Sequence, residues 1–267
     1  MGESRKLPKN VFSVLGAAGA CASNWSRQGL DFLFPPLCIS CGGRIGEPYA
    51  LCSKCWRDVS FVEGAACARC GLPFEIDAGE NAVCAACYAV PTVFDRARSI
   101  LHYDEASKRL ILGFKHGDRL ERAPALIGWL ERAGRVLAQD ADFIVPVPLH
   151  PSRLWRRRYN QSAILAQGIA RRFGKTYAPL LLERVRRTPS QGAMPSAKAR
   201  HRNVAGAFQV AKPERYEIRG KNVLLLDDVY TTGATLNACA AALRGAGAGQ
   251  INALTLARVV RDRARPI

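Results

Sequence analysis

The chain has 267 residues and a mass of 29.1 kDa, and 48% of its residues are hydrophobic, which is enough to form one large domain or two small domains with a buried core. This composition excludes collagen-like, acidic disordered and membrane-spanning proteins. The chain contains 39 Lys and Arg residues against 22 Asp and Glu residues, and the resulting formal charge of +17 favours polyanionic partners.

Residues 1–30 imitate part of a signal peptide, because three basic residues precede the apolar run Val11–Ala22. Twelve residues are too few to span a bilayer. The small residues Ala18, Gly19 and Ala20 would suit a cleavage site, but the thiolate-rich segment that follows belongs in a reducing compartment. We therefore expect a cytoplasmic protein with a disordered or loosely helical leader, and a targeting segment is the alternative.

Eight of the ten cysteines form four Cys-x-x-Cys pairs, a spacing that disulfide frameworks rarely show. Two such pairs at turns supply the four thiolates of a structural zinc site, whereas iron–sulfur ligation and redox dithiols are the alternatives. Cys21 and Cys239 remain as ordinary small apolar residues. The sequence therefore predicts two zinc ions, with the ligands Cys38, Cys41, Cys52, Cys55, Cys67, Cys70, Cys84 and Cys87.

Residues 31–90 are expected to form a double zinc ribbon that depends on metal, because the segment is too small and too polar to fold on hydrophobic burial alone. The gaps between the pairs are 10, 11 and 13 residues, each suited to a hairpin or loop. Sequential pairing gives two ribbons in tandem, and interleaved pairing is the alternative. Gly42, Gly43 and Gly71 follow cysteines at turns where a positive φ is needed.

Residues 91–267 alternate between strand and helix patterns, which predicts a doubly wound, mainly parallel α/β domain. A continuous apolar run such as Val223–Leu226 is typical of a central strand that is covered on both faces. In such a domain the site lies at the carboxyl ends of the strands. We expect strands at 99–103, 142–148, 223–226 and 251–259, and helices at 105–115, 162–173 and 232–244.

Residues 143–221 contain 17 Lys and Arg residues against three acids, a surplus of 14 positive charges. A solvated basic surface is the simplest explanation. The loop after Pro146 carries Arg153, Arg156, Arg157 and Arg158, whose guanidinium groups suit a diphosphate. They equally suit a nucleic-acid backbone, with Trp155 and Tyr159 as candidate stacking surfaces for bases.

Residues 184–208 are rich in Arg, Ser, Gly and Pro and lack apolar periodicity, which favours a mobile basic loop or hood over the site. His201 in this segment is interpreted as a polar surface residue. Lys115 and His116 could cap the C-terminus of their helix.

The segment from Val223 to Thr235 carries the strongest signal. An apolar strand delivers Asp227 and Asp228 to the sheet edge, and a Thr/Gly loop then opens a helix. Paired carboxylates at a buried strand end would be costly without ligands, which disfavours an ordinary capped turn. Hydroxyls and backbone N–H groups at a helix N-terminus can cradle a monophosphate. The candidate phosphate-binding residues are Thr231, Thr232, Gly233, Ala234 and Thr235.

This segment resembles the sugar-phosphate-binding motif of the type I phosphoribosyltransferases. The resemblance implies that residues 231–235 hold the 5′-phosphate of phosphoribosyl pyrophosphate (PRPP), and that Asp227 and Asp228 hold its ribose hydroxyls. It also implies Mg²⁺ bound with PRPP. No GxxxxGK[ST] sequence is present, so a Walker-type site is not supported.

Combined with the four cysteine pairs, the motif resembles the ComF family, in which a double zinc ribbon precedes a type I phosphoribosyltransferase-like domain. The likeness covers residues 30–260 and includes the segments 31–36, 114–118, 146–148 and 159–161. It implies that Asn160 and Gln161 contribute to a pyrophosphate or nucleic-acid site and that Gln191, Arg200 and Asn203 belong to a hood. Arg158 departs from the family, which usually has glycine there.

The resemblance implies a protein that binds PRPP or a related phosphate ligand together with single-stranded DNA, and that acts in DNA uptake or recombination. A metabolic phosphoribosyltransferase with an unknown acceptor is one alternative. A zinc-ribbon adaptor that recruits DNA-processing proteins is another.

Overall fold

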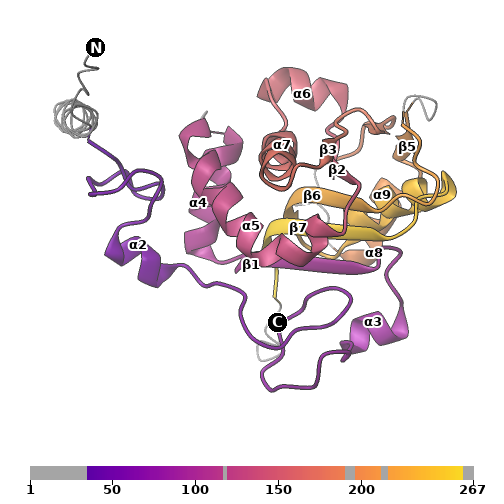
Figure 1. Ribbon diagram of the computed structural model, residues 1–267, viewed down its shortest axis with the longest axis horizontal. Helices are drawn as coiled ribbons and strands as arrows, with labels where there is room; N and C mark the ends of the chain where they lie inside the picture. Colours follow the sequence, from indigo (N-terminus) through magenta and orange to yellow (C-terminus); the bar gives the residue numbers. More distant parts are fainter. Residues whose placement is uncertain (1–34, 117–118, 190–195, 212–215, 261–267) are drawn as a thin grey trace, which may run out of the picture. The chain divides into compact units, whose positions relative to one another are not determined.

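The computed structural model describes residues 35–116, 119–189, 196–211 and 216–260, and the chain divides after Cys52 into two compact units (Figure 1). The expected leader over residues 1–30 and the hood residue Gln191 lie outside the described residues. In the part of the chain that is described, no helix combines the length and the apolar character needed to cross a membrane.

The two zinc ribbons have the same turn geometry. Antiparallel bridges flank each first cysteine pair, joining Leu37 to Arg44 and Ala66 to Pro73. In each turn the N–H of a glycine donates to the carbonyl of the first cysteine, at 2.9 Å in both cases. The internal repeat that the cysteine spacing predicts is therefore confirmed. In each ribbon a short helix begins directly after the third cysteine and contains the fourth, namely α2 (Ser53–Asp58) and α3 (Ala85–Ala89).

The second unit contains a five-stranded parallel sheet with the strand order β1-β7-β6-β2-β3. The continuous apolar run places β6 in its centre, as predicted. The strand runs four residues beyond that run, through Asp227 and Asp228, because β7 continues alongside as a hydrogen-bonding partner. The strands are β1 (Arg96–His102), β2 (Phe143–Pro146), β3 (Thr176–Tyr177), β6 (Val223–Tyr230) and β7 (Ile251–Arg258).

Helices cover both faces of this sheet. On one face α5 packs on β1 and β7, and α7 packs on β2 and β6, while α9 contacts β7 from the other face. In Figure 1 the strands run through the middle of this unit, with α7 above them and α3 below. The longer helices are α4 (Glu105–His116), α5 (Ala123–Gln139), α7 (Gln161–Phe173) and α9 (Ala234–Gly245), and the short 3₁₀ helix η1 spans Leu120–Arg122.

The second ribbon belongs to the core on the α9 side of the sheet. Its four cysteines share one buried apolar cluster with sheet residues such as Val145 and Leu225 and with α9 residues such as Leu236. The ribbon thus covers part of the sheet face where a doubly wound domain would usually place a helix.

The outer edge of β1 is also covered by the ribbon segment. The N–H of Val62 donates to Ile100, the N–H of His102 donates to Ser60, and the N–H of Ala97 donates to Arg69 at 2.6 Å. Paired edges do not recruit further strands, so this covering protects the sheet from edge-to-edge association.

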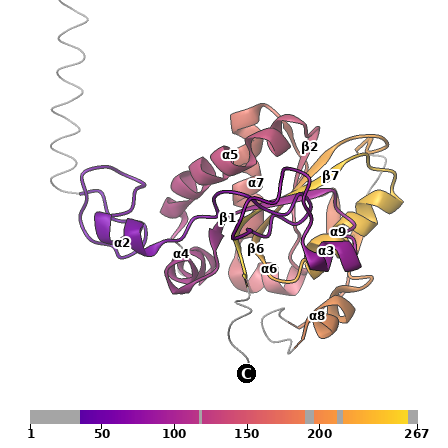
Figure 2. The same cartoon turned by 90° about the horizontal axis from the view of Figure 1, so that it is seen from below.

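Several elements differ from those expected. The loop predicted after Pro146 contains α6 (Pro151–Arg157), which begins with His150 as its N-cap residue and a proline in its first turn. The segment predicted as a mobile basic loop is anchored by a two-stranded antiparallel sheet of β4 (Leu182–Arg184) and β5 (Phe208–Val210). The segment between these strands contains α8 (Ala197–Val204), which packs on α9 (Figure 2).

Candidate functional site

Each set of four cysteines brings its sulfur atoms together in the sequential pairing that the spacing favours. All four Sγ atoms of each set lie within 4.8 Å of one another. The sequential pairing is therefore confirmed and the interleaved alternative is excluded. The first cluster consists of Cys38, Cys41, Cys52 and Cys55, and the second of Cys67, Cys70, Cys84 and Cys87.

The geometry of both clusters fits a tetrahedral zinc ion. Zinc–sulfur bonds of about 2.3 Å require sulfur atoms about 3.8 Å apart. The Sγ atoms of Cys41 and Cys52 are 3.8 Å apart, and those of Cys70 and Cys84 are 3.7 Å apart. Two zinc ions with eight thiolates would change the formal charge by −4, from +17 to about +13, so the protein stays strongly basic.

Backbone N–H groups prepare the first cysteine of each cluster for metal binding. The N–H of Cys52 donates to Cys38 Sγ, and the N–H of Cys84 donates to Cys67 Sγ, both at 3.3 Å. Burial raises the pKa of these two thiols, but such donors outweigh burial and bring the pKa to about 6 for Cys38 and about 7 for Cys67. Thiolates, the form that binds zinc, are therefore accessible near neutral pH.

The carboxylates of Asp227 and Asp228 lie near the carboxyl end of β6, where α4 and α7 supply their partners. Lys115 Nζ lies 2.7 Å from Asp228 Oδ2, and both side chains are largely buried. The hydroxyl of Ser162 donates to Asp227 Oδ1 at 3.2 Å. Lys115, which the sequence suggested as a helix cap, instead pairs with a carboxylate of the candidate site.

Asp227 is held in a setting that disfavours its charged form. Burial raises its pKa from 3.8 to about 7, and the adjacent carboxylate of Asp228 acts in the same direction. The N–H of Asp228, the Lys115 ammonium and the Ser162 hydroxyl oppose that rise. Asp227 therefore titrates near neutral pH.

The loop between β6 and α9 has the conformation expected of an anion cradle. Gly233 adopts a left-handed conformation (φ 75°) as the N-cap residue of α9. A Cβ at Gly233 would lie 2.5 Å from the hydroxyl of Tyr230, so the loop requires glycine on two counts. Thr232 Oγ1 is buried and has no hydrogen-bond partner among the residues that the structure describes. An orphaned buried hydroxyl at a helix N-terminus is a group that a ligand oxygen would satisfy.

The basic residues after β2 divide into exposed and engaged groups. Trp155 on α6 is 87% exposed. Arg158, also exposed, ends α6 with a positive φ of 66°, so its backbone takes the conformation for which the family's glycine is suited. Arg153 donates to the carbonyl of Thr188 in the basic segment. Arg156 and Arg157 also lie on α6.

Asn160 and Gln161 hold protein segments together. The Asn160 amide donates to the carbonyl of Val147 and its Oδ1 caps α7, and the buried Gln161 amide donates to the carbonyl of Lys115. Tyr159, considered as a stacking surface, donates its hydroxyl to Phe114 at 2.8 Å. These contacts fix the end of α4, and with it Lys115, beside β6.

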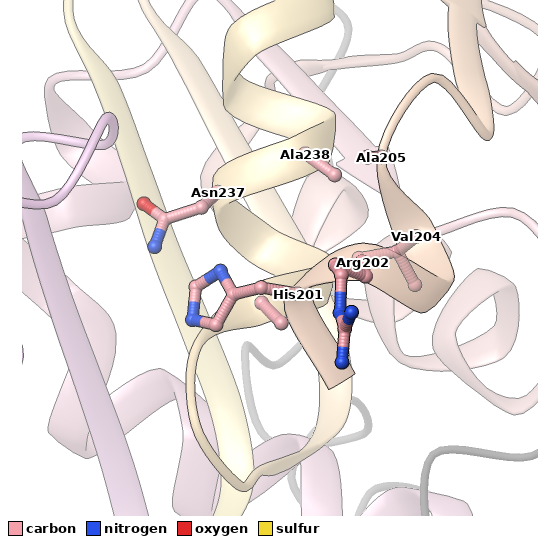
Figure 3. A pocket seen from close by; sticks show the side chains of 7 residues that line it. His201, Arg202, Val204, Ala205, Asn237 and Ala238 are labelled. Atoms are coloured by element: carbon pink, nitrogen blue, oxygen red, sulfur yellow. The ribbon is translucent and has the colours of Figure 1, made fainter. Parts of the chain in front are cut away.

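The expected hood residues Arg200 and Asn203 lie on α8, and the Asn203 amide donates to the carbonyl of Pro189. Between α8 and α9 lies a cavity of about 380 Å³ (Figure 3). His201 and Arg202 border it from α8, and Asn237 borders it from α9. His201 is exposed at the cavity rim, in agreement with a surface role.

Three residues near the site were not singled out from the sequence. Ser162 and Arg258 reach it only through tertiary packing, and no local pattern marks them. Arg184 is buried in β4, where it stacks over Phe208 and donates to Thr188. The sequence did contain a sign that Arg184 is buried, because this residue lies in an apolar stretch of the basic segment.

Residues 29–88 match the double zinc ribbon domain, and residues 160–266 match the phosphoribosyl transferase domain. Together with the parallel sheet and the two four-cysteine clusters, these matches define a class of protein in which a double zinc ribbon is joined to a phosphoribosyltransferase domain.

Relatives of this class span most of the chain. Competence protein F of Haemophilus influenzae is 32% identical over 229 residues, which cover 83% of this chain and 96% of the relative. DNA utilization protein YhgH of Salmonella typhi is 32% identical over 233 residues, covering 85% and 98%. The chain belongs to the ComF family. Among solved structures, the glutamine PRPP amidotransferase of B. subtilis complexed with ADP and GMP has 22% identity and a TM-score of 0.34, covering 54% of this chain and 30% of that chain.

Proposed function

We propose that the loop between β6 and α9 binds the phosphate of PRPP or of a related sugar phosphate. The observation that carries the proposal is the buried, unpartnered hydroxyl of Thr232. Leaving such a group unsatisfied costs about 1–3 kcal/mol, which a ligand oxygen would recover. The hydroxyl lies beside the N-terminus of the 12-residue helix α9, where the first-turn N–H groups and the helix dipole favour an anion.

In this proposal each part of the motif has one task. Residues 231–235 hold the phosphate, and Asp227 and Asp228 accept hydrogen bonds from the ribose hydroxyls. These carboxylate oxygens are also of the kind that Mg²⁺ prefers, and Mg²⁺ when bound with PRPP supplies positive charge at the diphosphate. Lys115, paired with Asp228, keeps that carboxylate oriented and adds a positive charge close to the ligand.

The first prediction is that Asp227→Asn combined with Asp228→Asn, or Thr232→Val alone, weakens PRPP binding about ten- to a hundredfold. Each lost hydrogen bond to a charged group is worth about 1.5–3 kcal/mol. Calorimetric titration with PRPP and Mg²⁺ measures the effect. Thr176→Val, on the exposed strand β3, is the matched control and should leave affinity unchanged. Titrations of wild-type and site variants that coincide would contradict the proposed roles.

We also propose that the basic surface around α6 binds single-stranded DNA and that the protein acts in DNA uptake or utilization. Two observations support this: the almost fully exposed indole of Trp155 stands among arginines, and the chain carries a surplus of 14 positive charges over residues 143–221. Exposed aromatic rings among cations suit stacked bases and a phosphate backbone. The names of the relatives, a competence protein and DNA utilization proteins, agree with that role.

The second prediction concerns salt. Affinity for single-stranded DNA should fall linearly with salt in a log–log plot, with a slope of about −0.7 for each neutralised phosphate. Replacing Arg156, Arg157 and Arg158 together with Gln should flatten the slope by about two units, whereas Trp155→Ala should lower affinity with little change of slope.

Fluorescence anisotropy with a labelled oligonucleotide measures these slopes. A matched control is the double variant Arg132→Gln with Arg135→Gln, which removes two exposed charges from α5 and should leave the slope nearly unchanged. PRPP should compete with DNA if the two ligands share the arginines. A slope near zero, or one insensitive to the triple replacement, would refute the DNA-binding surface.

A metabolic phosphoribosyltransferase and a zinc-ribbon adaptor remain the competing functions. Release of pyrophosphate from PRPP that depends on an added acceptor would establish the enzyme. If the chain binds both DNA and PRPP but releases no pyrophosphate when acceptors are added, the result supports the proposed function.

A further inference from the structure

Arg258, the last residue of β7, is a buried cation that has no acidic partner in the described part of the chain. Its side chain is 3% exposed, and within the described residues it forms no ion pair with a carboxylate. Its Nη1 donates to the carbonyl of Cys70 at 2.6 Å, while Nε is buried and unpaired. A buried charge without a counter-charge is strongly destabilising, so Arg258 needs a negative group close by.

The second cysteine cluster supplies that negative group once it holds zinc. Four thiolates around one Zn²⁺ carry a net charge of −2. Arg258 contacts the cluster through Cys70, and the half-buried Arg98 donates to the carbonyls of Cys67 and Ala68 at 3.5 and 3.4 Å. Two guanidinium groups thus face a dianion, and the local charges balance.

Arg258 also contacts the residue that shapes the phosphate loop. Its guanidinium carbon lies 5.0 Å from the centroid of the Tyr230 ring, and the two residues are paired in register between β6 and β7. The ring of Phe94 also packs edge-on against the ring of Tyr230, with the two ring centroids 6.3 Å apart. The hydroxyl of Tyr230 in turn fills the space where Gly233 has no side chain.

We propose that Arg258 is a positioning residue that couples zinc in the second cluster to the phosphate loop. Zinc holds Arg258 against the ribbon, Arg258 holds the Tyr230 ring, and the ring supports the left-handed turn at Gly233. The effect on ligand affinity rests on the proposed phosphate site, whereas the effect on zinc does not.

The zinc arm is tested by release of zinc from the full chain to a colorimetric chelator. Zinc release from the two clusters should give two kinetic phases. The phase of the second cluster is the one that remains in the variant Cys41→Ser, because that variant disrupts the first cluster. Arg258→Met should accelerate that phase about tenfold or more, in line with the usual effect of losing an outer contact to metal ligands. Arg258→Lys, which keeps the charge, should restore much of the slow release, and Arg171→Met, an exposed control on α7, should match wild type.

The loop arm is tested with ribose 5-phosphate as the calorimetric probe on zinc-loaded protein. Arg258→Met should bind it about tenfold more weakly than wild type. Tyr230→Leu should do the same while it retains zinc like wild type, because it breaks the link on the far side of Arg258. Unchanged zinc release in Arg258→Met, or weakened zinc with unchanged affinity in both variants, would overturn the coupling.

The two proposals fail in distinguishable ways. If wild-type protein does not bind ribose 5-phosphate, the proposed function fails. The coupling is then decided by hydrogen exchange of the amides of residues 231–235, which should become faster in Arg258→Met than in Arg171→Met. Equal exchange in the two variants would overturn it.

Discussion

Cys84→Ser is expected to release one of two zinc ions and to lower the unfolding free energy of the second unit by about 3–5 kcal/mol. Cys84 is buried in the core that the ribbon shares with β6 and α9, so a lost ligand there disturbs packing as well as metal binding. For a unit of this size the expected fall in melting temperature is about 6–20 °C. Metal analysis and thermal melts followed by circular dichroism measure both effects.

Cys41→Ser is the matched control. Cys41 is exposed and lies in the other compact unit. The variant should therefore release the zinc ion of the first cluster, while the main melting transition stays close to that of wild type. Wild-type protein that holds fewer than two zinc ions when freshly reduced, or two serine variants that melt alike, would contradict this assignment.

Asp227→Asn is expected to stabilise the protein at pH 8 by about 1–3 kcal/mol while it weakens ligand binding. The folded protein holds the pKa of Asp227 at about 7, above the 3.8 of an ordinary aspartate, so the folded state binds the proton more tightly than the unfolded state. The contribution of Asp227 to the stability of the protein is therefore fully present below about pH 4 and is lost as the pH rises through 7. Asparagine removes that loss, since it never ionises.

Denaturant titrations at several pH values test this prediction. The gain from Asp227→Asn should be largest above pH 7 and should vanish near pH 4. Asp228→Asn is an informative comparison, because it removes the ion pair with Lys115 and should lower stability at pH 8. A gain from Asp227→Asn that is the same at pH 4 and pH 8 would show that the carboxylate charge is not its cause.

Local spacing was enough to predict the two four-cysteine clusters and the turn between β6 and α9. A Cys-x-x-Cys turn brings two sulfur atoms together within four residues, and the Thr/Gly loop after an apolar strand is equally local. The central strand could be predicted from four consecutive apolar residues, but its end could not, because only pairing with β7 carries β6 on to Tyr230.

The sequence predicted the helices α4, α7 and α9 but not α5, α6 and α8. The short helices α6 and α8 lack an apolar stripe: α6 relies on its His150 cap and first-turn proline, and α8 on its Ser196 cap. α5 does have apolar residues at helical spacing, among them Leu126 and Leu130, so a signal was present and was overlooked. The contacts of Lys115 and Arg258 join distant parts of the chain, and no sequence window contains both partners.

The bond between Arg258 and Cys70 also bears on how the protein is made. Its two ends are separated by 188 residues, so the ribbon leaves the ribosome long before β7 exists. Zinc can enter the cysteine turns early, because each cluster is local in sequence. The inner edge of β1, which pairs with β7, and the underside of the ribbon, however, must wait for the last strand, and closing so long a loop is slow. A chain that ends before β7 would present a charged metal cluster and an unpaired edge of β1, and unpaired strand edges are prone to aggregation.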